Sequence, residues 1–165
     1  MYKEGRKQMK GKENEKGITG IDLTIAVILI MMLLSVILAL FYNNYLNSQA
    51  TKRNAEANTF VTNLFTYAET LDYAEVTETT LRTYINSEFG KYNVVAQENE
   101  GDTENNLNNH SYSMYVTVTN YKDMPENQGK DLQDYIKLIQ VKVSYNVGNK
   151  IDSEEFSTLK VIERE

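Results

Sequence analysis

The chain has 165 residues, no cysteine, one histidine and a net charge of −6. The lack of cysteine excludes disulfides and thiolate chemistry, and a single histidine, His110, excludes a multi-histidine metal site and argues against a Ser-His-Asp triad. The charge is uneven: residues 1–17 carry six Lys or Arg against three Glu, whereas the remainder has a net charge of −9. An acidic domain is a poor match for direct binding of nucleic acid, whose phosphates are held by Lys and Arg.

Residues 1–16 are polar, charged and without hydrophobic periodicity. They predict a cytosolic leader without regular structure, which lacks the apolar core of a secretory signal peptide. Because this basic leader precedes an apolar run, the positive-inside rule places the N-terminus in the cytoplasm and the C-terminus outside.

The apolar run covers Leu23 to Tyr42, and only Thr24 and Ser35 are plainly polar apart from the Tyr42 hydroxyl. As a helix it would be about 30 Å long, which matches the hydrocarbon core of a bilayer. Both hydroxyl side chains can bond back to carbonyls of their own helix. Since the run has no polar face, it predicts a membrane-spanning helix rather than a soluble core helix.

The segment that joins the leader to this helix reads Lys16-Gly17-Ile18-Thr19-Gly20-Ile21-Asp22. With the helix that follows, to residue 42, it resembles the cleavage and methylation signal of type IV prepilins and pseudopilins. The resemblance implies that prepilin peptidase cuts between Gly17 and Ile18, that Ile18 is N-methylated, and that Thr19 and Asp22 serve assembly. The family usually has Phe or Met in place of Ile18 and Glu in place of Asp22, so methylation stays open.

Asp22 also has a physical interpretation that does not depend on the family. A carboxylate beside hydrocarbon is costly unless it is paired. Cleavage after Gly17 would create a positive amine four residues before Asp22, and this amine could pair with the Asp of a neighbouring subunit or with its own. The alternative is that Asp22 only marks the cytoplasmic edge of a signal anchor.

The helix is expected to continue well beyond Tyr42, because residues 43–73 contain neither Pro nor Gly. Apolar residues recur there at helical spacing, and polar residues occupy the other faces. The sequence thus predicts one helix of about 50 residues, apolar all round in its first half and amphipathic in its second, without a Pro kink. The apolar stripe contains Phe60, Leu64, Tyr67 and Leu71, flanked by Ala57, Val61 and Ala68, and the polar faces carry Lys52, Arg53, Glu56, Asn63 and Glu69.

A short second helix is predicted over 77–89, with Gly90 as a suitable C′ residue, followed by a short strand over 92–96. Residues 97–110 are rich in Asn and acidic residues and predict a solvated loop. Carboxylates and amide carbonyls are calcium ligands, but the EF-hand spacing is absent, so no metal site or cofactor is predicted and a role for residues 98–110 in binding calcium or a partner stays open.

The remaining chain is expected to form strands. Alternation of apolar and polar residues predicts one strand over 112–118 and another over 139–147, with a connecting loop over 120–130. Gly148-Asn149 is a two-residue hairpin signal, and the chain would return over 156–162. Such a loop sets Val147 opposite Lys150 and Val141 opposite Phe156. The returning strand has Phe156 on one face and Leu159 and Val161 on the other, so its register stays open, as does the order of the strands. We expect Val141 and Val143 to face the amphipathic half of the long helix.

These elements predict an α+β fold in which the long helix packs on a small antiparallel sheet of three to four strands, as the pilin resemblance also implies. The expected organisation is a removed leader (1–17), a transmembrane and assembly segment (18–42) and an extracytoplasmic pilin-like domain (43–165).

The first functional hypothesis is a structural subunit, a minor pilin or pseudopilin, of a type IV pilus-like filament; pilus, competence and secretion systems stay open. Its partners would be prepilin peptidase, other pilin or pseudopilin subunits, the inner-membrane assembly platform and membrane lipid. It would lie in the cytoplasmic membrane and then in a cell-surface filament. The alternative is a single-pass membrane-anchored binding or sensor domain that does not polymerise. No nucleophile–base pair, phosphate loop or metal-ligand cluster points to an enzyme.

Overall fold

A computed structural model describes residues 20–124, 127 and 135–161. Its first element is helix α1 (Gly20–Thr70), and the chain divides into two compact units, Met1–Tyr45 and Leu46–Glu165, with the division inside this helix. We call these the N-terminal unit and the C-terminal unit. The long helix and a four-stranded sheet confirm the predicted α+β class.

The sheet of the C-terminal unit has the strand order β1-β2-β3-β4. The strands are β1 (Val94–Ala96), β2 (Tyr112–Asn120), β3 (Ile136–Val147) and β4 (Lys150–Val161). The last three are antiparallel neighbours, as expected, but β1 pairs parallel with β2 and makes the sheet mixed. The connection from β1 to β2 contains helical turns and is long enough to carry the chain back to the same end of the sheet, which a parallel pair requires.

The hairpin between β3 and β4 has the predicted register. Val147 lies opposite Lys150 and Val141 lies opposite Phe156. The turn residue Gly148 has a φ of 60°, a left-handed conformation that suits glycine and that two-residue hairpins need. The side chain of Phe156 is half-buried and packs against the core, whereas Leu159 lies on the opposite face and is exposed.

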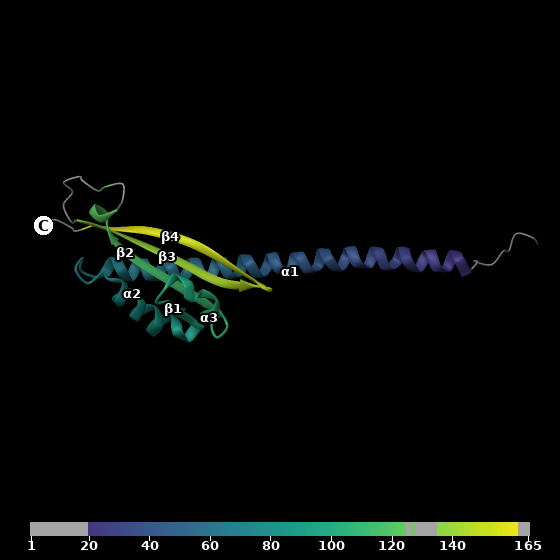
Figure 1. The fold of residues 1–165 in the computed structure, drawn as a ribbon, viewed down its shortest axis with the longest axis horizontal. Coiled ribbons are helices and arrows are strands. Elements are labelled where there is room, and N and C mark those ends of the chain that lie inside the picture. The colour runs from purple at the N-terminus through teal and green to yellow at the C-terminus, as the bar shows by residue number, and fades with distance from the viewer. Residues whose placement is uncertain (1–19, 125–126, 128–134, 162–165) are drawn as a thin grey trace, which may run out of the picture. The chain divides into compact units, whose positions relative to one another are not determined.

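The core of the C-terminal unit lies between the sheet and the second part of α1 (Figure 1). The predicted stripe is correct: Ala57, Phe60, Val61, Leu64 and Ala68 are buried, and Tyr67 and Leu71 are half-buried against the same core. The stripe shares this core with the alternate residues of β2 and β3 that point inward, which confirms the predicted face of β3. These strand residues are Tyr112, Met114, Val116, Ile139, Val141, Val143 and Tyr145.

The second helix is present as α2 (Glu78–Tyr84), which continues into a π-helical turn, η1 (Ile85–Phe89). Thr77 caps its N-terminus, since the Thr77 hydroxyl accepts a hydrogen bond from the backbone N–H of Thr80 at 3.2 Å. The expectation for Gly90 is wrong: it has an ordinary helical φ and begins another turn, η2 (Gly90–Tyr92), and the left-handed residue is Asn93 at φ 62°. Asn tolerates this conformation better than most non-glycine residues, so it can take the role expected of Gly90.

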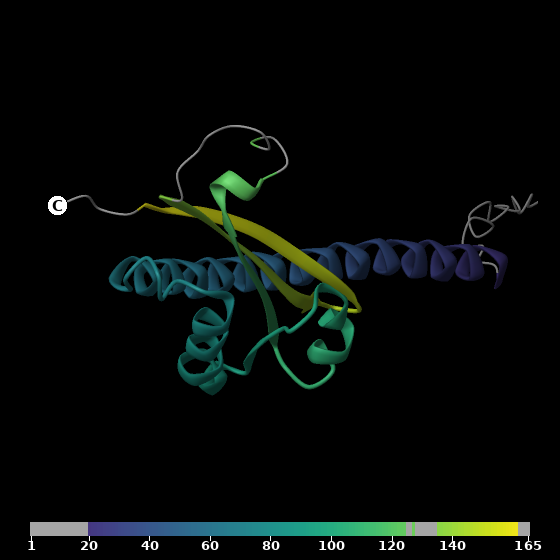
Figure 2. The same ribbon diagram turned by 60° about the vertical axis from the view of Figure 1, so that its left-hand side comes forward.

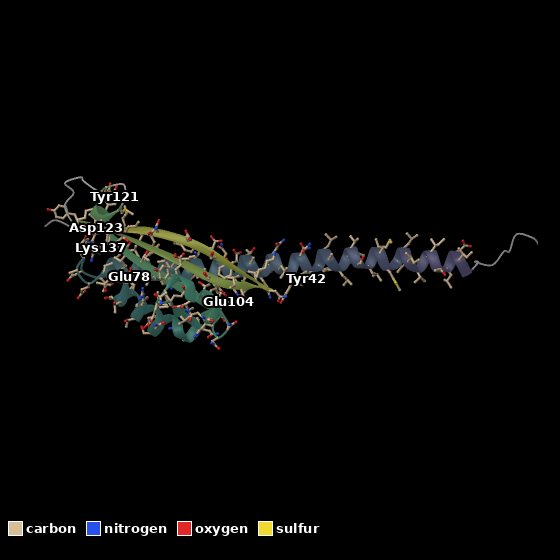
Figure 3. The ribbon with its side chains drawn as sticks, viewed as in Figure 1. Tyr42, Glu78, Glu104, Tyr121, Asp123 and Lys137 are labelled. Carbon is tan, nitrogen blue, oxygen red and sulfur yellow. The ribbon has the colours of Figure 1, made fainter. Side chains whose placement is uncertain are left out.

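Polar contacts fasten α2 and the turn before it to the sheet. The carboxylate of Glu78 accepts from the backbone N–H of Val118 at 3.3 Å, and the ammonium of Lys137 donates to the carbonyls of Tyr73 and Val76 at 2.7 and 2.9 Å. Figure 3 labels Glu78 on α2 and Lys137 on β3. Figures 1 and 2 both place α2, β1 and α3 together, on the β2 side of the sheet.

Residues 97–110 are not a solvated loop throughout. They contain a 3₁₀ turn, η3 (Glu100–Asp102), and a short helix, α3 (Thr103–Leu107), whose Leu107 is buried. Gln97 is also buried, and its amide donates to the hydroxyls of Ser113 at 2.6 Å and Thr103 at 3.0 Å. Leu107 and the buried amide of Gln97 therefore fix this segment to the rest of the unit, although its composition predicts a solvent-exposed loop. The connection after β2 begins with a 3₁₀ turn, η4 (Tyr121–Asp123), and most of its later residues lie outside the described part.

Candidate functional site

Three of the predicted site residues, Gly17, Ile18 and Thr19, lie outside the described residues. The fourth, Asp22, lies in the first turn of α1. A carboxylate there is favourable because the helix N-terminus carries a partial positive charge. Asp22 stands immediately before the apolar run, a position that both the predicted role in assembly and the alternative of a residue at the membrane edge require.

The apolar run forms the part of α1 that belongs to the N-terminal unit, and we call Leu23–Tyr42 the apolar half of α1. It is long and apolar enough to cross a membrane, as its length and composition indicate, and none of its most apolar window is buried within the described chain. Figure 3 shows side chains projecting on all sides of this half, with Tyr42 labelled at its end. Aliphatic side chains without cover are costly in water, so this half is compatible with a transmembrane anchor.

The two polar residues of the apolar half are satisfied within the helix. The hydroxyl of Thr24 donates to the carbonyl of Gly20 at 2.8 Å, and the hydroxyl of Ser35 donates to the carbonyl of Met32 at 2.7 Å. This confirms the predicted back-bonding. Neither hydroxyl interrupts the apolar surface with an unmet hydrogen bond.

A polar cluster in the C-terminal unit was not predicted. Tyr112 is a buried residue whose hydroxyl donates to the partly exposed carboxylate of Glu56. The guanidinium of Arg53 lies 5.0 Å from the centre of the Tyr112 ring and 3.9 Å from the same carboxylate. Burial, and next the hydrogen bond to Glu56, raise the pKa of Tyr112 to about 12. Helical periodicity assigned Arg53 and Glu56 to solvent, and only the packing of β2 on α1 brings Tyr112 to them.

A second cluster ties the acidic segment to the outer face of the sheet. The ammonium of Lys142 on β3 lies 3.2 Å from the carboxylate of Glu100 and 3.6 Å from that of Glu155. The hydrogen bond to Glu100 is the main cause of a raised pKa of Lys142. Within the described residues, no three acidic or histidine side chains gather in a way that could hold a metal ion. Lys142 thus offsets negative charge of Glu100 in the acidic segment and of Glu155 on β4.

Comparisons with protein-family models, with curated proteins and with solved structures returned no significant match.

Proposed function

We propose that the chain is a structural, non-enzymatic subunit of a type IV pilus-like filament, a minor pilin or pseudopilin. The observation that carries this proposal is the contrast along α1. Among the described residues none buries the most apolar window of the apolar half, and the same helix then supplies the core stripe of a small α+β unit. A subunit that leaves the membrane and assembles through its N-terminal helix needs both features in one helix.

The sequence before α1 supports the same proposal. The junction Gly17-Ile18 lies between the basic leader and Asp22, where prepilin peptidase would cut. The new amine of Ile18, methylated or not, would pair with the Asp22 carboxylate of a neighbouring subunit at the edge of the apolar run, where an unpaired carboxylate is costly. Thr19 lies between these two charges and would belong to the same contact.

Membrane lipid, the inner-membrane assembly platform and other subunits are the further partners that assembly would require. Before assembly the apolar half would sit in the lipid of the cytoplasmic membrane, with the leader inside and the C-terminal unit outside. The inner-membrane platform would transfer it to the apolar halves of other subunits at the cell surface. Direct contact with nucleic acid is not part of the proposal, because the chain beyond residue 17 is strongly acidic.

The proposal is tested first by the mass of the intact protein extracted from its native membrane. We expect the mature chain to begin at Ile18 and to have 148 residues. Gly17→Trp should leave the full-length form, because a bulky side chain blocks the cut, whereas Gly11→Trp, a matched change within the leader, should be processed normally. If the native protein still begins at Met1, the filament proposal fails and the single-pass anchored domain becomes the better hypothesis.

A further inference from the structure

At the end of the N-terminal unit, α1 carries different side chains on its two sides. Phe41, Tyr42 and Tyr45 are exposed rings, and Asn43 and Asn44 between them are exposed amides. At about 100° per residue the three rings fall within one arc of about 100°, and the two amides fall outside it. We call the rings the aromatic face and the amides the amide face. The apolar run before them has no such division.

Charged side chains are absent from α1 well beyond the apolar run. None follows Asp22 until Lys52, and all the residues between them belong to α1. The 29 residues from Leu23 to Thr51 would span about 43 Å as a helix. That is more than the hydrocarbon core of about 30 Å and close to a bilayer with its headgroup layers, about 40–45 Å. The charge-free length past Tyr42 therefore matches one headgroup layer.

The two faces suit different depths in that layer. Tyrosine fits the boundary between headgroups and acyl chains, because its ring is apolar and its hydroxyl is polar. An asparagine amide needs hydrogen-bond partners, which water and headgroups supply and acyl chains do not. A helix that stands upright would hold rings and amides at nearly the same depth. A helix that tilts towards its aromatic face lowers the rings to the acyl boundary and lifts the amides towards water.

We infer that the aromatic face of α1 binds the boundary between headgroups and acyl chains in the outer leaflet, so that the helix leaves the membrane at a tilt. The inference rests on the membrane-resident step of the filament proposal and names the face that meets the lipid. Transmembrane helices tilt by about 20° on average, and a helix with its side chains is about 10 Å across. Opposite faces at one level would then differ in depth by about 3 Å, which equals the rise of two residues.

The test uses nitroxide labels on the full chain in phosphatidylcholine nanodiscs. The chain has no cysteine, so a Cys substitution at each position from 41 to 45 gives one label per variant. Oxygen partitions into acyl chains and a nickel complex stays in water, so the collision rates of a label with both report its depth. We expect oxygen to dominate at 41, 42 and 45 and the nickel complex at 43 and 44. The label at 45 should lie no farther from the bilayer centre than the label at 43, whereas an upright helix would place it about 3 Å farther out.

Two further variants control for composition and for insertion. Phe41→Asn combined with Asn44→Phe keeps the composition but spreads the rings around the helix. In this background the label at 45 should lie about 3 Å farther out than the label at 43. A label at Leu33→Cys, in the middle of the apolar half, should collide with oxygen and not with the nickel complex, which shows that the helix is inserted.

The inference is overturned if depth falls steadily from 41 to 45, if the exchanged variant keeps the order of the parent, or if the label at 33 is reached from water. It is also overturned if the labels at 41, 42 and 45 are shielded from both reagents, because protein would then cover the aromatic face. The mass of the native protein tests the filament proposal separately. A chain that begins at Ile18 but stands upright in the bilayer loses this inference alone.

Discussion

The two parts of α1 differ in burial: the apolar half is exposed, and the second part contributes buried residues to the core. Leu33 in the apolar half is 63% exposed, whereas Leu64 is fully buried, although both are leucines of one helix. The difference comes from the neighbours of each residue on the helix surface. Around Leu64 the polar residues leave a single stripe that a sheet can cover; around Leu33 there is no polar face, so one covering element would leave most of the apolar surface in water.

This comparison separates apolar surface that the chain buries by its own folding from apolar surface that the described residues leave exposed. Burial of a leucine side chain contributes about 2 kcal/mol to stability. The stripe of α1 obtains this contribution within the C-terminal unit. None of the most apolar window of the apolar half is buried by the described residues, so on the filament proposal lipid or other subunits would supply this contribution. Substitutions in the two parts should therefore have opposite consequences for folding and assembly.

The largest effect on folding is expected from Val143→Asp. Val143 is fully buried in the core that β3 shares with α1, and an unpaired carboxylate there should cost about 4 kcal/mol and unfold the C-terminal unit. Val161→Asp makes the same change at an exposed position of β4 and should alter the free energy of unfolding by about 0.5 kcal/mol or less. Urea unfolding of the full chain in nanodiscs, followed by tyrosine fluorescence, measures both. Equal free energies of unfolding of Val143→Asp and its parent would show that the strand face is misassigned.

A matched pair of leucines addresses the comparison directly. Leu64→Ala should lower the free energy of unfolding of the C-terminal unit by about 3 kcal/mol, because it leaves a cavity in a closed core. Leu33→Ala removes the same atoms from an exposed position and should not change that free energy. Hydrogen exchange of the amides in β2 and β3 reports the two effects. A loss of protection in the Leu33 variant would contradict the division of roles along α1.

A smaller effect, dependent on pH, is expected at Tyr112. Its pKa is about 12 in the folded chain and 10 without the fold, so the unfolded chain releases the phenol proton first as pH rises. The stabilisation of the folded chain by the protonated Tyr112 is complete below pH 10 and is lost as the pH rises towards 12. By pH 11 the free energy of unfolding of the parent should have fallen by about 1 kcal/mol through this group. Tyr112→Phe should be less stable by about 1 kcal/mol at pH 8 but should lose less stability between pH 8 and 11. Tyr121→Phe, the control, should follow the parent; equal losses in the parent and Tyr112→Phe would exclude this titration.

Much of the fold could be predicted because local patterns determine it. The period of the stripe from Ala57 to Leu71 identified the buried face of α1, and Gly148-Asn149 set the register of the β3–β4 hairpin. The parallel pairing of β1 could not be predicted, because a strand of three residues has no sequence pattern that distinguishes parallel from antiparallel pairing. The helical turn at Thr103–Leu107 depends on a single buried leucine that composition does not reveal.

The candidate sites also differ in whether the sequence could reveal them. The junction around Gly17 and Asp22 is a contiguous motif, so the sequence alone suggests a role for each residue. The cluster of Arg53, Glu56 and Tyr112 joins residues far apart in sequence, and each of them looks ordinary in its own element. Only the packing of β2 against α1 reveals that cluster.

The smallest effect on folding, and the most specific effect on assembly, is expected from Asp22→Ala. Asp22 belongs to the N-terminal unit, so the free energy of unfolding of the C-terminal unit should not change. Insertion into the membrane should not suffer either, because removal of a charge beside an apolar helix favours burial. The step that should fail is pairing with a neighbour's new amine. The variant should therefore be stable, processed and membrane-resident, yet missing from sheared filaments and from crosslinks with other subunits.

Asp22→Glu keeps the charge and should enter filaments nearly as the parent does. The measurement must follow this protein itself, because a filament built mainly of another subunit could form without a minor one. Quantitative detection of the tagged chain in sheared filaments, normalised to its amount in the membrane, meets this requirement. Normal incorporation of the Ala variant would mean that Asp22 only marks the edge of the membrane, and the apolar half would then have to direct assembly through its aliphatic surface alone.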